Sequence, residues 1–345
     1  MNVARLPLLS VVVPAFNEEA VLTEFHRRLA AAIAPLPYQA EIIYVNDGSS
    51  DGTRELLWQL GRSDPRVGVV DLSRNFGKEA ALTAGLDHAR GDAVVVIDAD
   101  LQDPPEVIPN LVSRWQDGFD VVYARRTERN GESWLKKITA YLFYRVIERT
   151  SSVPIPRDTG DFRLLSRRAV EALGKLREQH RFMKGLFAWI GYPQTEVRYR
   201  RDPRGAGATK WNYWRLWNFA LEGITSFTTA PLRVATYLGL LTATAAFLFG
   251  IFIIVDTLIY GNPVAGYPSL LSVVLFLGGV QLVALGVIGE YLGRLFDEAK
   301  GRPLYLVKQY QPAPAVMGES RSGHDGLPGH IVTPCPFPQE AETEQ

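Results

Sequence analysis

Residues 94–106 read "VVVIDADLQDPPE", an apolar run that leads directly into three aspartates. Consecutive Val and Ile residues are typical of a strand that is buried on both faces of a parallel sheet. Asp98, Asp100 and Asp103 follow within six positions. Because ligands bind at the carboxyl ends of the strands in such sheets, the segment predicts a central strand, Ala93–Asp98, with a binding site at its end.

Short apolar runs alternate with helix-like segments on both sides of this stretch. The predicted strands are Leu9–Val13, Glu41–Asn46, Val67–Leu72, Ala93–Asp98 and Asp120–Ala124, and the predicted helices are Glu19–Ala34, Thr53–Gly61, Lys78–Ala89 and Pro105–Gln116. Alternation of this kind indicates an α/β fold. We therefore predict a Rossmann-like, mostly parallel sheet with helices on both faces.

The acidic pair that ends the central strand has the spacing of a cation site. Asp98 and Asp100 are two residues apart, so in extended chain both side chains leave on the same side. Carboxylates and a carbonyl oxygen, here that of Gln102, are ligands that Mg²⁺ and Mn²⁺ accept. The alternative is an ordinary solvated acidic loop.

Polar residues also follow the first two predicted strands. Asn17 and Glu18 come after the first strand, and Asp47 comes after the second. These residue types also favour simple turns. The glycine pattern of a dinucleotide site is missing after the first strand, which argues against a nicotinamide or flavin cofactor.

The composition excludes several classes of protein. The chain has 37 basic and 37 acidic residues, so no overall charge attracts it to nucleic acid. Cys335 is the single cysteine, which excludes a disulfide framework and argues against a cysteine metal site.

Two long uncharged stretches predict membrane spans. Val234–Val255 has 22 residues and Tyr267–Gly289 has 23, and a helix of about 20 residues crosses a bilayer core. The alternative is a buried helical hairpin. Lys and Arg flank the pair on its outer sides and are missing from the connector 256–266, so both chain ends are expected in the cytoplasm.

Two segments before the predicted spans have the composition of interface helices. The pattern of residues 134–149, which include Lys137, predicts a basic amphipathic helix that suits either the membrane interface or the face of the sheet. Residues 213–227 are rich in the aromatic side chains found at headgroup depth. After about residue 311, Pro, Gly, Ser and Glu dominate, and we expect disorder.

The ordered motifs resemble a known family. They are "VVPAFNEE", "VNDGSSDGT", "NFGKEAALTAGLDHARGD", "DADLQDPPE", "DTGDFRLLSRR" and "RGAGATKW", followed by the two predicted spans. The chain resembles the family 2 glycosyltransferases of GT-A fold, in the polyprenyl-phosphate branch that includes dolichol-phosphate mannose synthase and bactoprenol glucosyltransferases. The resemblance covers roughly residues 8–308.

The resemblance implies a role for specific residues. The implied nucleotide pocket consists of Pro14, Ala15, Asn17, Glu18, Asp47 and Asp98, and the implied Mg²⁺ or Mn²⁺ ligands are Asp98, Asp100 and Gln102. The implied catalytic residue is Asp161, with Asp158 beside it. The cations implied to receive phosphates are Arg126, Lys137, Arg201, Arg204 and Lys210. The basic residues of the last group also have a simpler explanation, because positively charged loops flank most cytoplasmic membrane entries.

The reaction that the resemblance implies is an inverting, metal-dependent transfer of one hexose from a nucleotide sugar, UDP-glucose first, to polyprenyl (undecaprenyl) phosphate. The product is a β-linked polyprenyl-phosphate sugar, made at the cytoplasmic face of a bacterial inner membrane, and it requires a later flippase and a periplasmic glycosyltransferase. The sugar could instead be mannose, N-acetylglucosamine, galactose or 4-amino-arabinose. Asp161 is expected to orient a partner or to act as a base.

Two other functions compete with this one. A processive polysaccharide synthase needs a Q-x-x-R-W segment and more spans, whereas this chain has "QHRF" at residues 179–182. An inactive nucleotide-sugar-binding membrane scaffold would not need the acids at positions 98, 100 and 161. Gly289 and Gly293, at the end of the second predicted span, are either ordinary glycines of a span or residues that allow close helix contact, so a homo-oligomer is reasonable.

The predicted domains follow from these features. They are a cytoplasmic GT-A catalytic domain (1–210), an interface helix (211–230), a two-helix transmembrane hairpin (231–293) and a cytoplasmic C-terminal segment (294–345).

Overall fold

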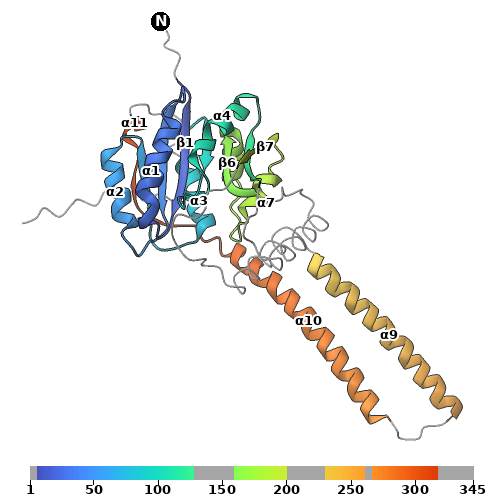
Figure 1. Ribbon diagram of the computed structural model, residues 1–345. Coiled ribbons are helices and arrows are strands. Elements are labelled where there is room, and N and C mark those ends of the chain that lie inside the picture. The colour runs from blue at the N-terminus through green and yellow to red at the C-terminus, as the bar shows by residue number, and fades with distance from the viewer. Residues whose placement is uncertain (1–5, 128–158, 200–229, 261–265, 318–345) are drawn as a thin grey trace, which may run out of the picture.

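The computed structural model describes residues 6–127, 159–199, 230–260 and 266–317 (Figure 1). One eight-stranded sheet forms its centre, in the order β7-β5-β6-β4-β1-β2-β3-β8. The strands are β1 (Leu8–Ala15), β2 (Gln39–Asn46), β3 (Val67–Leu72), β4 (Ala93–Val96), β5 (Val121–Arg126), β6 (Thr159–Ser166), β7 (Gln194–Tyr199) and β8 (Val307–Gln311). The helices are α1 (Glu19–Ile33), α2 (Thr53–Ser63), α3 (Lys78–His88), the 3-10 turn η1 (Pro105–Val107), α4 (Ile108–Gln116), α6 (Arg167–Gly174), α7 (Met183–Trp189), α9 (Ala230–Tyr260), α10 (Tyr267–Ala299) and α11 (Pro314–Met317).

The sheet is mixed rather than uniformly parallel. Strands β3, β2, β1 and β4 are parallel neighbours, as the alternation of strands and helices predicted. Strand β6 is inserted between β4 and β5 and runs antiparallel to both. Strand β6 was not among the predicted strands, because it follows residues 128–158 and no local pattern shows where such a strand pairs.

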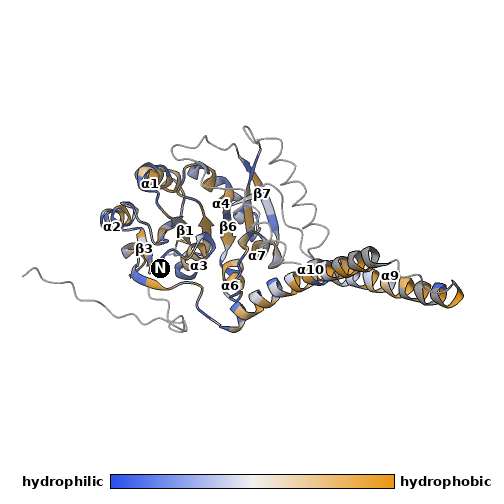
Figure 2. Ribbon diagram, turned by 90° about the horizontal axis from the view of Figure 1, so that it is seen from below, coloured by the Kyte–Doolittle hydropathy of each residue, from blue (hydrophilic) through white to orange (hydrophobic). Residues whose placement is uncertain are grey.

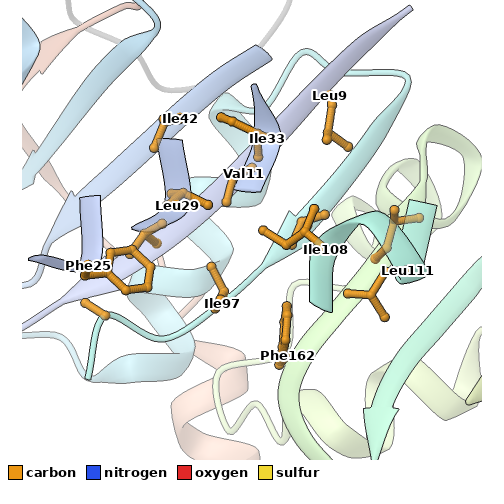
Figure 3. Close-up of a cluster of buried hydrophobic side chains, with 14 of the residues drawn as sticks. Leu9, Val11, Phe25, Leu29, Ile33, Ile42, Ile97, Ile108, Leu111 and Phe162 are labelled. Atoms are coloured by element: carbon orange, nitrogen blue, oxygen red, sulfur yellow. The ribbon is translucent and has the colours of Figure 1, made fainter. Parts of the chain in front are cut away.

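Helices cover both faces of the sheet, as predicted. On one face the apolar side chains of α1 and α4 pack on alternate residues of the strands, including Leu9 and Val11 of β1 (Figure 3). On the other face α3, α6 and α7 pack on the intervening residues, such as Val12 of β1. This alternation is what a strand with a side-chain period of two requires when it is buried on both sides.

The predicted element ends are close to the observed ends, with one instructive exception. Strand β4 ends at Val96, two residues before the predicted end at Asp98. The backbone nitrogen of Ile97 still donates to the carbonyl oxygen of Val12, but the chain then turns away from β1. The acidic segment is therefore a loop at the carboxyl edge of the sheet rather than part of the strand.

Two long helices, α9 and α10, extend away from the sheet side by side (Figure 1). Hydrophobic residues recur along both of them (Figure 2). By length and composition, and among the described residues alone, one segment is able to cross a membrane, namely Phe276–Ala299, and α9 contributes a shorter apolar segment, Val234–Phe249. The first of the two predicted spans, Val234–Val255, therefore stays a prediction.

The C-terminal end of α10 contacts the loop between α6 and α7. The backbone nitrogen of Gln179 donates to Oε1 of Glu298 at 2.6 Å, and Nε2 of His180 lies 3.1 Å from Oδ2 of Asp297. Beyond this contact the chain returns to the sheet, where β8 pairs antiparallel with β3. The end of α10 is thus connected to the rest of the structure in two ways, by its contact with the α6–α7 loop and by the pairing of β8 with β3.

The expected onset of disorder at about residue 311 is too early. Helix α11 follows β8, and its Val316 forms a small buried cluster with Ala313 and Leu8. Burial of these three apolar side chains orders a segment whose Pro-rich composition suggested disorder. The expectation for residues 318–345 lies outside the described residues.

Candidate active site

The pairing of β4 with β6 brings the two most important predicted acids together. Val96 pairs with Arg163 in antiparallel register. Continued two residues further, this register sets Asp98 opposite Asp161, although the two are far apart in sequence. Both aspartates lie where β4 leaves and β6 enters the carboxyl edge of the parallel strands, which is the edge where ligands bind in α/β sheets.

Lys78, the first residue of α3, connects these two acids. Its Nζ lies 2.7 Å from Oδ2 of Asp98 and 2.5 Å from Oδ2 of Asp161. Burial lowers the pKa of Lys78, but the negative charges of Asp161 and Asp98 outweigh burial and raise it well above its usual value. The lysine is therefore a cation at neutral pH, held between two carboxylates.

The charge state of Asp161 follows from its neighbours. Burial raises the pKa of this carboxyl, but the positive charges of Lys78 and Lys184 outweigh burial and hold the pKa below its ordinary value. Asp161 is thus ionised at neutral pH. Its second oxygen, Oδ1, is buried and has no hydrogen-bond partner among the described residues. An ionised oxygen of this kind is an acceptor that a ligand can use.

A second carboxyl lies close enough to Asp161 to interact with its charge. Burial, together with the charge of Asp161, raises the pKa of Glu79 to about 8. Its Oε2 is also buried without a hydrogen-bond partner within the described ranges. Arg163 supplies positive charge on β6, donating from Nη2 to the carbonyl oxygen of Gly160 at 2.8 Å.

The loop after β4 suits a hard divalent cation. Asp100 accepts hydrogen bonds from the backbone nitrogen of Gln102 at 3.1 Å and from its Nε2 at 2.6 Å, which orients the carboxylate and leaves the amide oxygen of Gln102 free of that contact. Asp98 instead contacts Lys78. No cluster of three His, Cys, Asp or Glu residues able to hold a metal occurs among the described residues. Mg²⁺ needs only one or two carboxylates when substrate phosphates complete its shell, so this oxygen set fits.

Asp103, the third acid of the opening segment, is buried and structural. It accepts a hydrogen bond from the phenol of Tyr199, and Nη2 of Arg126 lies 3.5 Å from its Oδ1. Nε of Arg126 also donates to the phenolic oxygen of Tyr199 at 3.1 Å. Arg126, predicted to receive phosphate, is thus held in place by two partners at the carboxyl edge.

The predicted nucleotide pocket consists of linked strand ends. Asn17, in the left-handed conformation with φ 55°, accepts a hydrogen bond from the backbone nitrogen of Ser50 at 2.8 Å. The backbone nitrogen of Asp47 donates to the carbonyl oxygen of Ala15 at 3.0 Å. Pro14 and Ala15 end β1 beside β2, and Glu18 precedes α1 directly, so these residues do meet at one edge.

The carboxylate of Asp47 points to the loop before α3. It accepts from the backbone nitrogens of Phe76 at 2.7 Å and Gly77 at 3.0 Å. These two bonds fix the residue that precedes Lys78. In this structure Asp47 therefore positions the start of α3, a role that the turn-like sequence did not suggest.

Some predicted site residues lie outside the described residues, and some residues of the site were not predicted. Asp158, Lys137, Arg201, Arg204 and Lys210 lie outside the described residues, as do the two segments with the composition of interface helices. Lys78, Glu79 and Lys184 were not predicted as site residues. The available signal was the "GKE" of "NFGKEAAL", a glycine followed by charged residues at the start of an otherwise apolar helix.

Comparisons with known proteins agree on the family. The model described as "Glycosyl transferase family 2" matches residues 10–174, and the model described as "GtrB C-terminal hairpin" matches residues 230–295. A Shigella flexneri protein named SfII prophage-derived bactoprenol glucosyl transferase is 52% identical over 301 residues, covering 87% of this chain and 97% of the relative. A prophage bactoprenol glucosyl transferase homolog of Escherichia coli is 50% identical over 301 residues, with 87% and 98% covered.

Solved structures show a weaker likeness. One is glucosyl-3-phosphoglycerate synthase from Mycobacterium tuberculosis in complex with Mn²⁺, uridine diphosphate and phosphoglyceric acid. It is 22% identical, covers 64% of this chain and 76% of that chain, and has a TM-score of 0.46.

Proposed function

This chain belongs to glycosyl transferase family 2 and is a hexosyltransferase, and from that premise we propose that it transfers glucose from UDP-glucose to a polyprenyl phosphate. The relatives named bactoprenol glucosyl transferase, which match almost their full length, support the lipid acceptor and the sugar. The observation that carries the proposal is the Asp98–Lys78–Asp161 cluster at the carboxyl edge of the sheet.

The leaving group determines what the site must do. When the sugar leaves UDP, negative charge develops on the terminal phosphate, and positive groups placed there in advance lower the barrier. We propose that Asp98, Asp100 and Gln102 hold Mg²⁺ or Mn²⁺, which would neutralise that charge. Lys78 and Arg126 supply further positive charge from the protein itself.

Asp161 is better suited to orienting the reactants than to accepting a proton. Its lowered pKa makes it a weak base at neutral pH. A phosphate monoester has a second pKa of about 6, so the acceptor is already largely a dianion and needs no base. We propose that Asp161 holds the sugar through a hydroxyl at its unpartnered Oδ1, and that the lipid phosphate attacks the anomeric carbon in line, with inversion.

The hairpin gives the site its access to lipid. We propose that α9 and α10 both cross the bacterial inner membrane, with the catalytic region and both chain ends in the cytoplasm. The contact of Glu298 and Asp297 with the α6–α7 loop supports this arrangement, because that loop leads directly into α7, which carries Lys184. An Asn262→Cys variant in a Cys335→Ser background should react with a membrane-impermeant maleimide in spheroplasts, whereas the wild-type Cys335 should not.

The reaction is tested directly with the full-length protein in liposomes. With Mg²⁺, polyprenyl phosphate and a panel of radiolabelled nucleotide sugars, UDP-glucose should give the fastest transfer of label into an organic-extractable product. A chelator should abolish transfer, and Mg²⁺ or Mn²⁺ should restore it. Full activity in the chelator, or in an Asp98→Ala/Asp100→Ala variant, would overturn metal dependence, and a faster reaction with another sugar would overturn glucose.

A further inference from the structure

Lys78 contacts the same carboxylate that the proposed divalent cation would use. A cation that binds Asp98 must approach the carboxylate oxygens, and Nζ of Lys78 already lies 2.7 Å from one of them. We propose that Lys78 competes with a divalent cation for Asp98 and, when it is displaced, moves its ammonium to the diphosphate of the donor. This inference rests on the proposed function for the nature of the donor.

The attachment of Lys78 permits such a movement. Its backbone is fixed, because Gly77, which precedes it with φ 96°, donates to Asp47 at 3.0 Å. Its side chain is not fixed by packing, since 45% of it is exposed. A lysine has a flexible four-carbon stem and a compact charge, so the ammonium can change partners while the backbone stays in place.

The charges around Lys78 favour an exchange over a permanent ion pair. Lys78 holds two carboxylates, Asp98 and Asp161, and a divalent cation on Asp98 would repel the ammonium at such a short distance. Asp161 keeps Lys184 as a second positive neighbour when Lys78 moves. The ammonium that leaves Asp98 then lies beside the place where the phosphates of the donor arrive.

A purely structural role makes a different prediction. If Lys78 only stabilises the ends of β4 and β6, its removal should weaken every ligand, because the carboxylates would lose their orientation. If Lys78 exchanges, its removal should strengthen binding of the metal alone and weaken binding of the nucleotide. The two effects have opposite signs, so binding measurements separate the two roles without any measurement of turnover.

The experiment is isothermal titration of purified full-length protein in detergent. In Lys78→Gln, Mn²⁺ alone should bind about tenfold more tightly than in the wild type, since an opposite charge at ion-pair distance is worth about one to three pKa units to a carboxylate. UDP in saturating Mn²⁺ should bind about tenfold more weakly. Lys175→Gln, on the exposed end of α6, should change neither value, and Lys78→Arg, which keeps the charge, should bind Mn²⁺ no more tightly than the wild type.

The exchange is overturned if Lys78→Gln binds Mn²⁺ with unchanged or lower affinity. A second measurement does not depend on the folding of a variant: in the wild type, Mn²⁺ should raise the rate at which Lys78 is acetylated by an amine reagent, relative to Lys175. An unchanged rate also contradicts the proposal. Neither measurement requires the lipid acceptor or the transferred hexose, so failure of the glucosyl transfer and failure of the exchange are distinguishable.

Discussion

Tyr199 donates its phenolic hydrogen to Asp103, a residue 96 positions earlier in the chain. The bond joins the end of β7 to the loop after β4, and Arg126 at the end of β5 contacts both partners. One buried carboxylate thus fixes three segments at the carboxyl edge of the sheet. Asp103, to which the sequence assigned no role, is therefore a structural residue of this edge.

Replacing Tyr199 by Phe should therefore affect both stability and donor binding. The buried Asp103 would lose its neutral donor, and an unsatisfied buried acceptor costs about 1–3 kcal/mol. Arg126 would also lose one of its two partners, so KM for the donor should rise more than kcat falls. Thermal unfolding and steady-state kinetics test this, and Tyr123→Phe on the same strand as Arg126 is the control. An unchanged KM would show that Tyr199 does not position Arg126.

Asp161→Asn should remove most of the activity while leaving the fold intact. Asparagine keeps the shape of the side chain but removes the charge that pairs with Lys78 at 2.5 Å. We expect turnover to fall at least about 100-fold, the usual effect of losing a positioned catalytic group. Transfer of label into lipid measures it, with circular dichroism as the control for folding. Near-normal turnover would refute any role for Asp161 in the reaction.

Glu79 predicts a pH dependence of stability. Its pKa is about 8 in the folded protein and near 4.5 when unfolded, so between these values unfolding releases a proton. Stability therefore falls as the pH rises from about 4.5 to about 8. The Glu79→Gln variant lacks this titrating carboxyl and the loss of stability that it causes. The Tm of the variant relative to the wild type should therefore be higher at pH 8.5 than at pH 5. An equal difference in Tm at the two pH values would contradict the raised pKa.

Gly85 tests how closely α3 packs on the sheet, and Gly174 in α6 is the control. A Cβ at Gly85 would lie 2.2 Å from Cγ1 of Val12, so Gly85→Ala should overpack the core and lower stability by about 1–3 kcal/mol. A Cβ at Gly174, in α6, would meet nothing within 4 Å, so Gly174→Ala should be neutral or stabilise by up to about 1 kcal/mol. Thermal unfolding in detergent measures both. A harmless Gly85→Ala would mean that α3 can shift, and with it Lys78.

Much of the parallel half of the sheet could be predicted from the sequence. β3 was predicted with its observed bounds, and the bounds of β1, β2 and β5 differ from the prediction by at most two residues at either end. The reason is that these signals are local: apolar runs between turn residues specify where a strand lies. The same reasoning placed Asn17, Asp47 and Asp98 at one edge, because parallel strands all end on the same side.

The pairing of distant segments could not be predicted in this way. No local feature of β6 or β8 predicts the strand with which it pairs. The insertion of β6 beside β4 sets Asp161 opposite Asp98. The predicted end of β4 at Asp98 was two residues too late, since the pairing of β4 with β1 and β6 ends at Val96. Tertiary contacts of this kind override the local pattern.

The sequence by itself determined the residue types at the edge of the sheet, the α/β class and the presence of two long apolar segments, since composition and periodicity are properties of short stretches of chain. Only the tertiary structure decided which charges meet. Lys78 became the partner of two aspartates because α3 begins beside the ends of β4 and β6, and the free energy of that contact depends on distances and burial that no single stretch of sequence contains.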